Sequence, residues 1–356
     1  MRKIKISFLI LTFLLEGIIF VPRFTTNAVK IAQASDADLK AGPYGPDISV
    51  GIKEYSKSYL KEHSFKISAN KKFNLKDREG NIISTVDANT NLKIRYDGDK
   101  YFWIYNSNPK IRIYRHITFD AADNDNYDLI FDINLPDYSY DQYRGKIRLR
   151  YAEIEDETDK IWVINIVPLE QYVWGMGEMT GTGPSEHNKV MTTIFRTYGY
   201  WKIKYSTKWA YLGFKVNATA GDQIYKGYEW EQDHPNIREA AEATKGKIVM
   251  YKNSIALTAY SSWNDGKTRR YEDGHWGKKC RKIKGTKSKI YPYLNLIKDP
   301  HGKHPSKSTC ALAKEGNHMV GLTANGSLDL AKNHHWDYGK ILKYYYSGVS
   351  IFKAYQ

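Results

Sequence analysis

The chain contains 356 residues, enough for two domains of ordinary size or for one large domain. Hydrophobic residues make up 42% and charged residues 26% of it, which predicts a globular protein with a core and excludes a disordered, collagen-like or multi-span membrane protein. The net charge of +15 indicates a protein that could bind polyanions. Because the N-terminus predicts export, we expect wall polymers or lipid head groups rather than nucleic acid, with most of the charge on a solvated surface.

Residues 1–34 have the composition of an export signal. Three basic residues precede a largely apolar run of 16 residues, Ile6 to Val21, which is short for a membrane-spanning helix. Small residues before Ser35 predict cleavage after Ala34, which would lower the net charge by four, to +11. The alternative is an uncleaved N-terminal membrane anchor. Both alternatives predict an extracytoplasmic protein, either secreted or periplasmic, or anchored to the outer face of the cytoplasmic membrane.

Residues 35–46 are small and polar and contain Pro and Gly, as expected of a linker. From Asp47 onward, short alternating segments bounded by turn residues predict an all-β module. These segments are DISVGI, SFKISA, KFNLKD, GNIISTV, NLKIRY and YFWIYN. The acidic, Tyr-rich residues 119–142 are expected to form an insertion or a surface hairpin, so that the β-rich module spans residues 47–142.

Residues 143–356 have a mixed pattern. Two strands, KIRLRYAEI and KIWVINIV, lead to Pro168, where a short helix through Gly175 is predicted. Pro184 begins the helix with the clearest apolar stripe, formed by Val190, Ile194, Tyr198, Trp201 and Tyr205. A helix over 236–245, the strands KIVMY and SIALTAYSS, and helices over 327–332 and 337–346 follow. The sequence therefore predicts an α+β fold, with a β-rich N-terminal module and a mixed α/β region of short strands and four to five helices.

Two cysteines, Cys280 and Cys310, occur in the chain. In an oxidising compartment they are expected to form a disulfide, which would stabilise the fold by roughly 3–4 kcal/mol. The alternative joins them to His301 and His304 in a metal site. These spacings match no standard zinc motif, so no metal and no other cofactor is predicted.

Four polar, glycine-containing segments interrupt the C-terminal half, namely Gly175–Gly183, Gly221–Gly227, Ser261–Thr268 and Gly316–Gly326. Glycine permits unusual backbone dihedrals and close approach of a ligand, and loops on a scaffold are where function concentrates. These segments are therefore the expected place of a site.

Short motifs in and around these segments occur in a specific order. They are VINIVPLEQYVWG, Gly177-Glu178-Met179, Phe195-Arg196-Thr197-Tyr198, Gln223-Ile224-Tyr225-Lys226-Gly227, AAEATKG, Ser261-Ser262 with Gly266 and Thr268, Trp276-Gly277, Pro292-Tyr293-Leu294, and His318 to Ser327. In this order the chain resembles the stage II sporulation protein D (SpoIID/LytB) family, which includes the amidase-enhancer proteins. The resemblance covers about residues 143–352.

The resemblance implies a lytic transglycosylase that cleaves peptidoglycan glycan strands, with Glu178 as the catalytic acid. One carboxylate is enough for this chemistry, because the muramic 6-hydroxyl replaces water as the nucleophile, unlike in ordinary glycosidases. Such a group works best when apolar neighbours raise its pKa, and Trp174, Met176 and Met179 are candidates for that environment. Without the resemblance, a solvent-exposed loop carboxylate would be the default interpretation of Glu178.

Further motif residues are expected to contact the substrate. These are Arg196, Gln223, Tyr225, Ser261, Ser262, Trp276 and His318. Several have a structural alternative: Arg196 pairs with an acid, Ser261 and Ser262 satisfy turn amides, and His318 serves as a hydrogen-bonding loop residue.

The sequence also departs from the family pattern. A Cys-x-x-x-His-Cys cluster able to hold zinc is replaced by residues 217–222, of which Asp222 is expected to take over a polar structural role. Gly177 stands where the family has Ser, and Ala324 where it has Gln. These changes favour the alternative function, a non-catalytic wall-binding protein that enhances an N-acetylmuramoyl-L-alanine amidase. The expected partners are glycan strands, an amidase or other wall hydrolase, and the membrane if the N-terminal segment is uncleaved.

Overall fold

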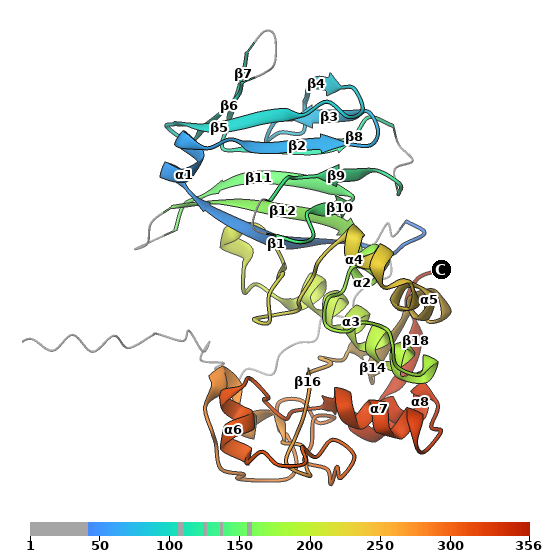
Figure 1. Ribbon diagram of the computed structural model, residues 1–356. Coiled ribbons are helices and arrows are strands. Elements are labelled where there is room, and N and C mark those ends of the chain that lie inside the picture. The colour runs from blue at the N-terminus through green and yellow to red at the C-terminus, as the bar shows by residue number, and fades with distance from the viewer. Residues whose placement is uncertain (1–41, 106–109, 124–126, 136–137, 155–158) are drawn as a thin grey trace, which may run out of the picture. The chain divides into compact units, whose positions relative to one another are not determined.

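A computed structural model describes residues 42–105, 110–123, 127–135, 138–154 and 159–356 (Figure 1). The chain divides into two units, Met1–Ala34 and Ser35–Gln356, and every element below belongs to the second. The predicted export signal and the first part of the linker lie outside the described residues. Within the described part of the chain, no helix is both long and apolar enough to cross a membrane.

The first half of the described chain consists mainly of strands. In order, its elements are β1 (Asp47–Ser56), α1 (Lys57–Glu62), β2 (Phe65–Ala69), β3 (Phe73–Lys76), β4 (Ile82–Val86), β5 (Leu92–Gly98), β6 (Tyr101–Ile104), β7 (Ile111–Tyr114), β8 (His116–Ala121), β9 (Ile130–Asp132), β10 (Gln142–Arg144), β11 (Lys146–Ala152) and β12 (Lys160–Pro168). The strands predicted from residue 47 onward are confirmed. Alternating burial, as in β2, β5 and β11, shows that one face of each strand packs on the core.

The second half mixes helices with short strands. Its elements are α2 (Leu169–Trp174), α3 (Ser185–Tyr205), β13 (Val216–Asn217), α4 (Tyr228–Asp233), α5 (Pro235–Ala243), β14 (Lys247–Tyr251), β15 (Ser254–Ile255), β16 (Tyr260–Ser261), α6 (Thr309–Lys314), β17 (Leu322–Thr323), α7 (Ala324–Lys332), α8 (Tyr338–Tyr345) and β18 (Ser350–Lys353). Three short 3-10 helices cover residues 210–212, 271–273 and 276–278 of the described chain. The predicted α+β class is confirmed.

The strands form four sheets within the described residues. The largest has the order β13-β1-β12-β11-β8-β3-β4, and the second has the order β10-β9-β2-β5-β6-β7. Two small sheets, β15-β14-β18 and β16-β17, belong to the second half. Because β11 and β12 pair with β8 and β1, the largest sheet combines strands from both sides of residue 142.

The acidic residues 119–142 contribute to the core as well as to the surface. Strands β9 and β10 pair as an antiparallel hairpin, as expected, and β9 also pairs with β2. Leu129, Phe131 and Ile133 have no exposed surface. The hairpin therefore forms one end of the second sheet and buries its apolar residues in the core. These few apolar residues alternate with the acidic ones that dominate the composition of the segment.

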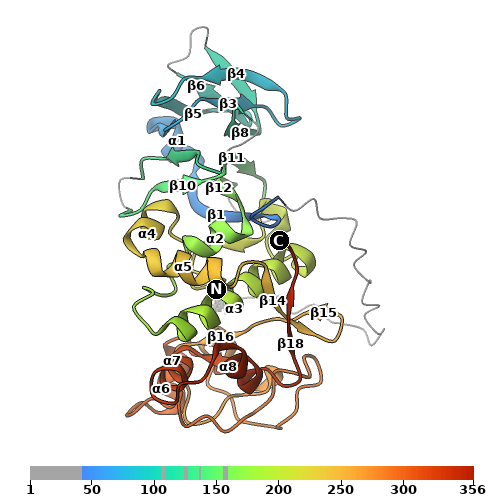
Figure 2. The ribbon, with the colours of Figure 1, turned by 90° about the vertical axis from the view of Figure 1, so that its right-hand side faces the viewer.

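Helix α3 is buried on more sides than its apolar stripe indicates, and Figure 2 shows it among the helices and short strands of the second half. It contacts α2, α5, α7, α8 and β14, so that Thr192, Thr193 and Thr197 are enclosed along with the aliphatic residues. Tyr205, expected on the apolar stripe, is 44% exposed at the end of the helix. The helix is thus a central element of the second half, and its buried polar residues need partners inside the protein.

Candidate active site

Glu178 lies on the loop between α2 and α3, which pairs with the segment before α4. Met176 forms an antiparallel bridge with Tyr225, and the Gly177 amide donates to the Ile224 carbonyl at 2.8 Å. A side chain at Gly175 could not be accommodated, because a Cβ there would lie 2.7 Å from the Gly227 carbonyl oxygen. Glycine therefore lets the two motif segments approach closely enough to fix the backbone that carries Glu178.

The Glu178 carboxyl group is partly buried and has two hydrogen-bond donors. Burial raises its pKa above the usual value, and the Ile224 amide and the Tyr260 hydroxyl partly offset this by stabilising the charged form. The Ile224 amide lies 2.7 Å from Glu178 Oε1. This environment differs from that of an exposed loop carboxylate, because it favours retention of a proton.

A chain of hydrogen bonds leads from Glu178 into the core. Beyond Tyr260, the Gln223 side-chain amide lies 3.5 Å from the Tyr260 hydroxyl oxygen, and the Tyr172 hydroxyl donates to Gln223 Oε1 at 3.0 Å. Gln223 and Tyr172 have no exposed surface. Sequence reasoning missed Tyr260, although it directly precedes the Ser261-Ser262 motif.

His318 bonds the backbone of the strand that carries Tyr260. Its Nδ1 accepts from the Val320 amide at 3.0 Å, which assigns the proton to Nε2, and the ring bonds the Tyr260 backbone carbonyl. Burial lowers the pKa of His318 to about 4, so the ring is neutral at physiological pH. The Trp276 ring lies 4.2 Å from the His318 ring, and Trp276 Nε1 donates to the Tyr271 carbonyl. Tyr260 thus connects the predicted residues Glu178 and His318.

Arg196 lies in the core and has no exposed surface. Its guanidinium forms a two-pronged ion pair with Glu170, with both N–O distances 2.8 Å, and donates to the Ala241 carbonyl at 2.9 Å. Glu170 also accepts from the Tyr355 hydroxyl. Arg196 therefore pairs with an acid inside the core, which is the structural alternative expected for it. A sugar could reach this side chain only if the core opened.

Other residues expected to bind substrate are also enclosed. Tyr225 is 4% exposed, and its hydroxyl donates to Asn165 at 2.9 Å. Ser261 is 8% exposed and pairs with Thr323 where β16 meets β17. Ser262 is exposed, and its carbonyl anchors α7 through Asn325. Of the predicted contacts, Ser262, Trp276 and His318 retain the most access to solvent.

Asp222 forms a closed cluster where the family carries its zinc ligands. Its carboxylate accepts from Lys202 at 2.6 Å, from Tyr198 at 3.1 Å and from the Asn217 amide at 3.0 Å, and also from Trp209 Nε1. Burial raises its pKa, but the Lys202 charge and these donors together hold the pKa below its usual value. Asp222 thus has the polar structural role expected for it.

Cys280 and Cys310 form a disulfide with their Cα atoms 5.0 Å apart. This pairing leaves no free thiol for the alternative metal site with His301 and His304. The bond joins the exposed segment after Trp276 to α6, both of which flank the loop that carries His318.

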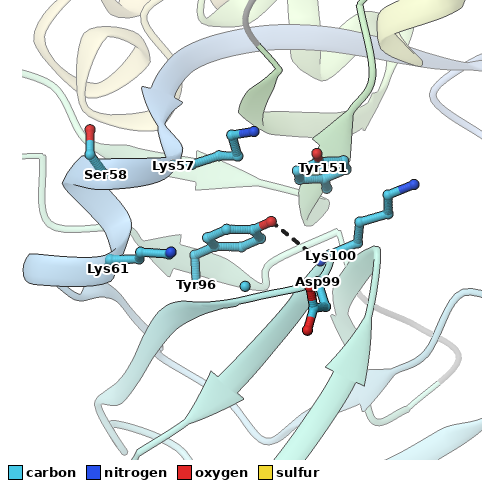
Figure 3. A pocket seen from close by; sticks show the side chains of 8 residues that line it. Lys57, Ser58, Lys61, Tyr96, Asp99, Lys100 and Tyr151 are labelled. Atoms are coloured by element: carbon cyan, nitrogen blue, oxygen red, sulfur yellow. Dashed lines mark hydrogen bonds between the residues drawn. The ribbon is translucent and has the colours of Figure 1, made fainter.

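A hollow of about 470 Å³ lies in the strand-rich half, beside α1 (Figure 3). Three lysines surround it, together with Tyr96 and Tyr151. Lys57 is paired with Asp159 at 3.2 Å, and Lys100 is paired with Glu153. Because acidic neighbours neutralise two of the three cations, the hollow lacks the uncompensated charge that would attract a polyanion.

Comparison with known proteins gives the same family as the motif order. Residues 157–251 match the family model SpoIID, described as Stage II sporulation protein. The amidase enhancer of Bacillus subtilis (strain 168) is 36% identical over 91 residues, which are 26% of this chain and 11% of that protein. Stage II sporulation protein D of the same organism is 27% identical over 181 residues, 47% of this chain and 49% of that protein.

An uncharacterized protein of Brachyspira hyodysenteriae is 31% identical over 113 residues, 31% of this chain and 29% of that protein. The matches therefore span about half or less of these relatives. The matched family segment contains Glu178, Gln223 and Tyr225, so the similarity to the SpoIID family includes the candidate site.

Proposed function

We propose that this protein is a peptidoglycan lytic transglycosylase in which Glu178 acts as general acid and then as general base. Similarity to the SpoIID family supports a cell-wall-related role. The observation that carries the catalytic part is the partly buried Glu178 carboxyl group, whose pKa is raised by burial and which is held by the Ile224 amide and the Tyr260 hydroxyl.

In the proposed reaction, Glu178 first gives up a proton and then takes one back. Protonated Glu178 donates its proton to the glycosidic oxygen, so that the bond to the anomeric carbon breaks and the leaving sugar departs as an alcohol. The Glu178 carboxylate then removes the proton from the muramic 6-hydroxyl, whose oxygen bonds to the anomeric carbon. The raised pKa suits the first step, because an ordinary glutamate would be almost fully ionised at neutral pH.

A second carboxylate is not needed, and Asp222, which directly precedes Gln223 in the motif, is committed elsewhere. Asp222 is 1% exposed in its side chain and bonds Lys202, Tyr198 and Trp209. It therefore could not activate a water, as a hydrolase would require. This arrangement favours transglycosylation over hydrolysis.

Residues around Glu178 would position the carboxyl group and the glycan. Tyr260 and Gln223 hold the carboxyl group from the core side. Trp276 and His318 are partly exposed, and because their ring nitrogens already bond backbone groups, they would offer a sugar the faces of their rings. Arg196 is assigned to folding instead.

The test is digestion of purified glycan strands with wild type, Glu178→Gln and Glu242→Gln, followed by mass spectrometry. Anhydro-muramic products are expected from wild type and from Glu242→Gln, since Glu242 is exposed on α5. Glu178→Gln should lose about 10²–10⁴-fold in rate, the usual contribution of a general acid or base. Equal activity in Glu178→Gln, or hydrolysed products without the anhydro ring, would exclude the proposed mechanism.

The second candidate function is a non-catalytic wall-binding protein that enhances an amidase. The 36% identity to the amidase enhancer favours it, as do the changes at Gly177 and Ala324. In that case wild type and Glu178→Gln would both sediment with purified sacculi, would release no glycan, and would stimulate an amidase to the same extent.

Both functions place the protein outside the cytoplasmic membrane, where glycan strands are found. The proposed localisation follows from the basic and apolar residues 1–34, as a cleaved signal or as a membrane anchor. N-terminal sequencing of the exported protein would distinguish the two, because cleavage predicts Ser35 as the first residue.

A further inference from the structure

We propose that His301, Asp329 and His334 form a binding site for a divalent transition-metal ion, with Zn²⁺ as the best-suited probe. The three side chains offer two imidazole nitrogens and one carboxylate oxygen, all within 4.8 Å of one another. The site is separate from Glu178 and from the replaced zinc motif at residues 217–222.

The spacing of the donor atoms suits a metal ion. Asp329 Oδ2 lies 2.7 Å from His301 Nδ1 and 3.5 Å from His334 Nε2. Zinc with bonds of about 2.0–2.2 Å in tetrahedral geometry requires ligand atoms about 3.4 Å apart, so small side-chain rotations are sufficient. Two imidazoles and one carboxylate leave a fourth position for water, and they favour zinc-like ions over Mg²⁺ or Ca²⁺.

The carboxylate of Asp329 is oriented toward the two imidazoles. Asn333 Nδ2 donates to Asp329 Oδ1 at 2.6 Å, which leaves Oδ2 to face His301 and His334. An outer hydrogen bond of this kind is what metal-ligating side chains commonly have.

The loop that carries His301 is fixed against the start of α7. Asp299 has no exposed surface, and it accepts from Thr323 at 2.7 Å and from the Gly302 amide at 3.1 Å. A Cβ at Gly302 would lie 2.0 Å from Thr323 Oγ1, so only glycine permits this approach. The position of the His301 backbone is therefore set before any ion binds.

The end of α7 turns back and brings His334 to the same place. The Asn333 amide donates to the Asp329 carbonyl at 2.8 Å, and the Trp336 amide donates to the Leu330 carbonyl at 3.1 Å. His335 adopts a positive φ of 53°, which reverses the chain. An ion bound here would join the 299–304 loop to α7, whose first residues support β16 and Tyr260 through β17.

The experiment uses the full chain, freed of metal with a chelator and titrated with ZnCl₂ by calorimetry and equilibrium dialysis. We expect one equivalent of Zn²⁺ to bind and to raise the melting temperature. His301→Ala and His334→Ala should each weaken binding at least 100-fold, whereas Asn333→Ala should weaken it about 10–100-fold. The matched control is His63→Ala, which removes an exposed imidazole at the end of α1, outside the cluster, and should bind within about twofold of wild type.

Saturable binding lost in both ligand variants, with MgCl₂ failing to compete, would establish the site. Absence of saturable Zn²⁺ binding, or binding unchanged in His301→Ala and His334→Ala, would overturn it. Far-UV circular dichroism checks that each variant is folded. His334 is exposed, so its substitution leaves the core intact and keeps the test decisive even if His301→Ala is unstable.

Discussion

The core around Arg196 and the surroundings of Glu178 are two polar regions built on neighbouring elements, and they differ in how completely their groups are paired. Arg196 and Glu170 have at most 1% of their side chains exposed, and both prongs of the guanidinium reach the carboxylate. Glu178 is only partly buried, and its hydrogen bonds come from one amide and one hydroxyl.

This difference supports the proposed division between motif residues that serve the fold and motif residues that serve chemistry. A fully enclosed ion pair costs several kcal/mol of desolvation and is retained only where geometry and extra hydrogen bonds compensate. Glu178, in contrast, remains partly exposed and has a raised pKa. An acid catalyst requires both access to the substrate and a carboxyl group that keeps its proton. Four substitutions test this comparison, from the largest expected effect to the smallest.

Arg196→Met should lower the free energy of unfolding by about 3–5 kcal/mol, because it leaves the Glu170 carboxylate buried without its charged partner. The measurement is urea denaturation. The control is Arg238→Met, which removes a 44% exposed arginine paired with Glu231 and should cost less than about 1 kcal/mol. A stable Arg196→Met protein with altered glycan affinity would instead return Arg196 to the substrate site.

Asp222→Asn should destabilise the protein by about 1.5–3 kcal/mol, the usual cost of losing a charged hydrogen-bond partner, since Lys202 stays buried. The folded-state pKa of Asp222 is lowered, so its contribution is present above the unfolded pKa of about 4 and is lost as the pH falls through the folded value. The difference from wild type should therefore shrink below about pH 4. Asp87→Asn, at an exposed pair with Lys72, should show neither effect.

Tyr260→Phe should reduce glycan cleavage about 3–10-fold, which corresponds to one hydrogen bond of about 0.5–1.5 kcal/mol. Because the Tyr260 hydroxyl stabilises the charged form of Glu178, its removal should raise the Glu178 pKa further. The alkaline limb of the pH–rate profile should then move to higher pH. A slower enzyme with an unshifted profile would assign Tyr260 to packing alone; Tyr211→Phe, at a 53% exposed tyrosine, is the control.

Glu178→Gln should stabilise the folded protein by about 0.5–2 kcal/mol at neutral pH, as substitutions at functional sites often do. The folded-state pKa of Glu178 is raised, so wild type loses stability as the pH rises from the unfolded value of about 4.3 through the folded value. Glutamine avoids this loss and can still accept from the Ile224 amide. Melting temperatures of both proteins at pH 4 and pH 8 measure the effect, and equal differences at the two pH values would contradict it.

The sequence by itself predicted the strands from Asp47 onward, the positions of α2, α3, α5, α7 and α8, and the similarity to the SpoIID family, and it singled out Glu178 as the candidate catalytic residue. These follow from local periodicity, proline positions and short ordered motifs, which depend on residues close together in the chain. The sequence made a disulfide between its two cysteines the simpler expectation, and the structure decided the matter by bringing their Cα atoms to 5.0 Å.

Only the tertiary structure decided what each motif residue contacts. Arg196 looked like a ligand because it lies in a motif, yet its partner Glu170 is 26 residues away, and Tyr260 gained a role through a contact with Glu178. The cluster of His301 and Asp329 depends likewise on side chains 28 residues apart. Burial and long-range pairing set the pKa and access of each group, and neither is encoded in local spacing.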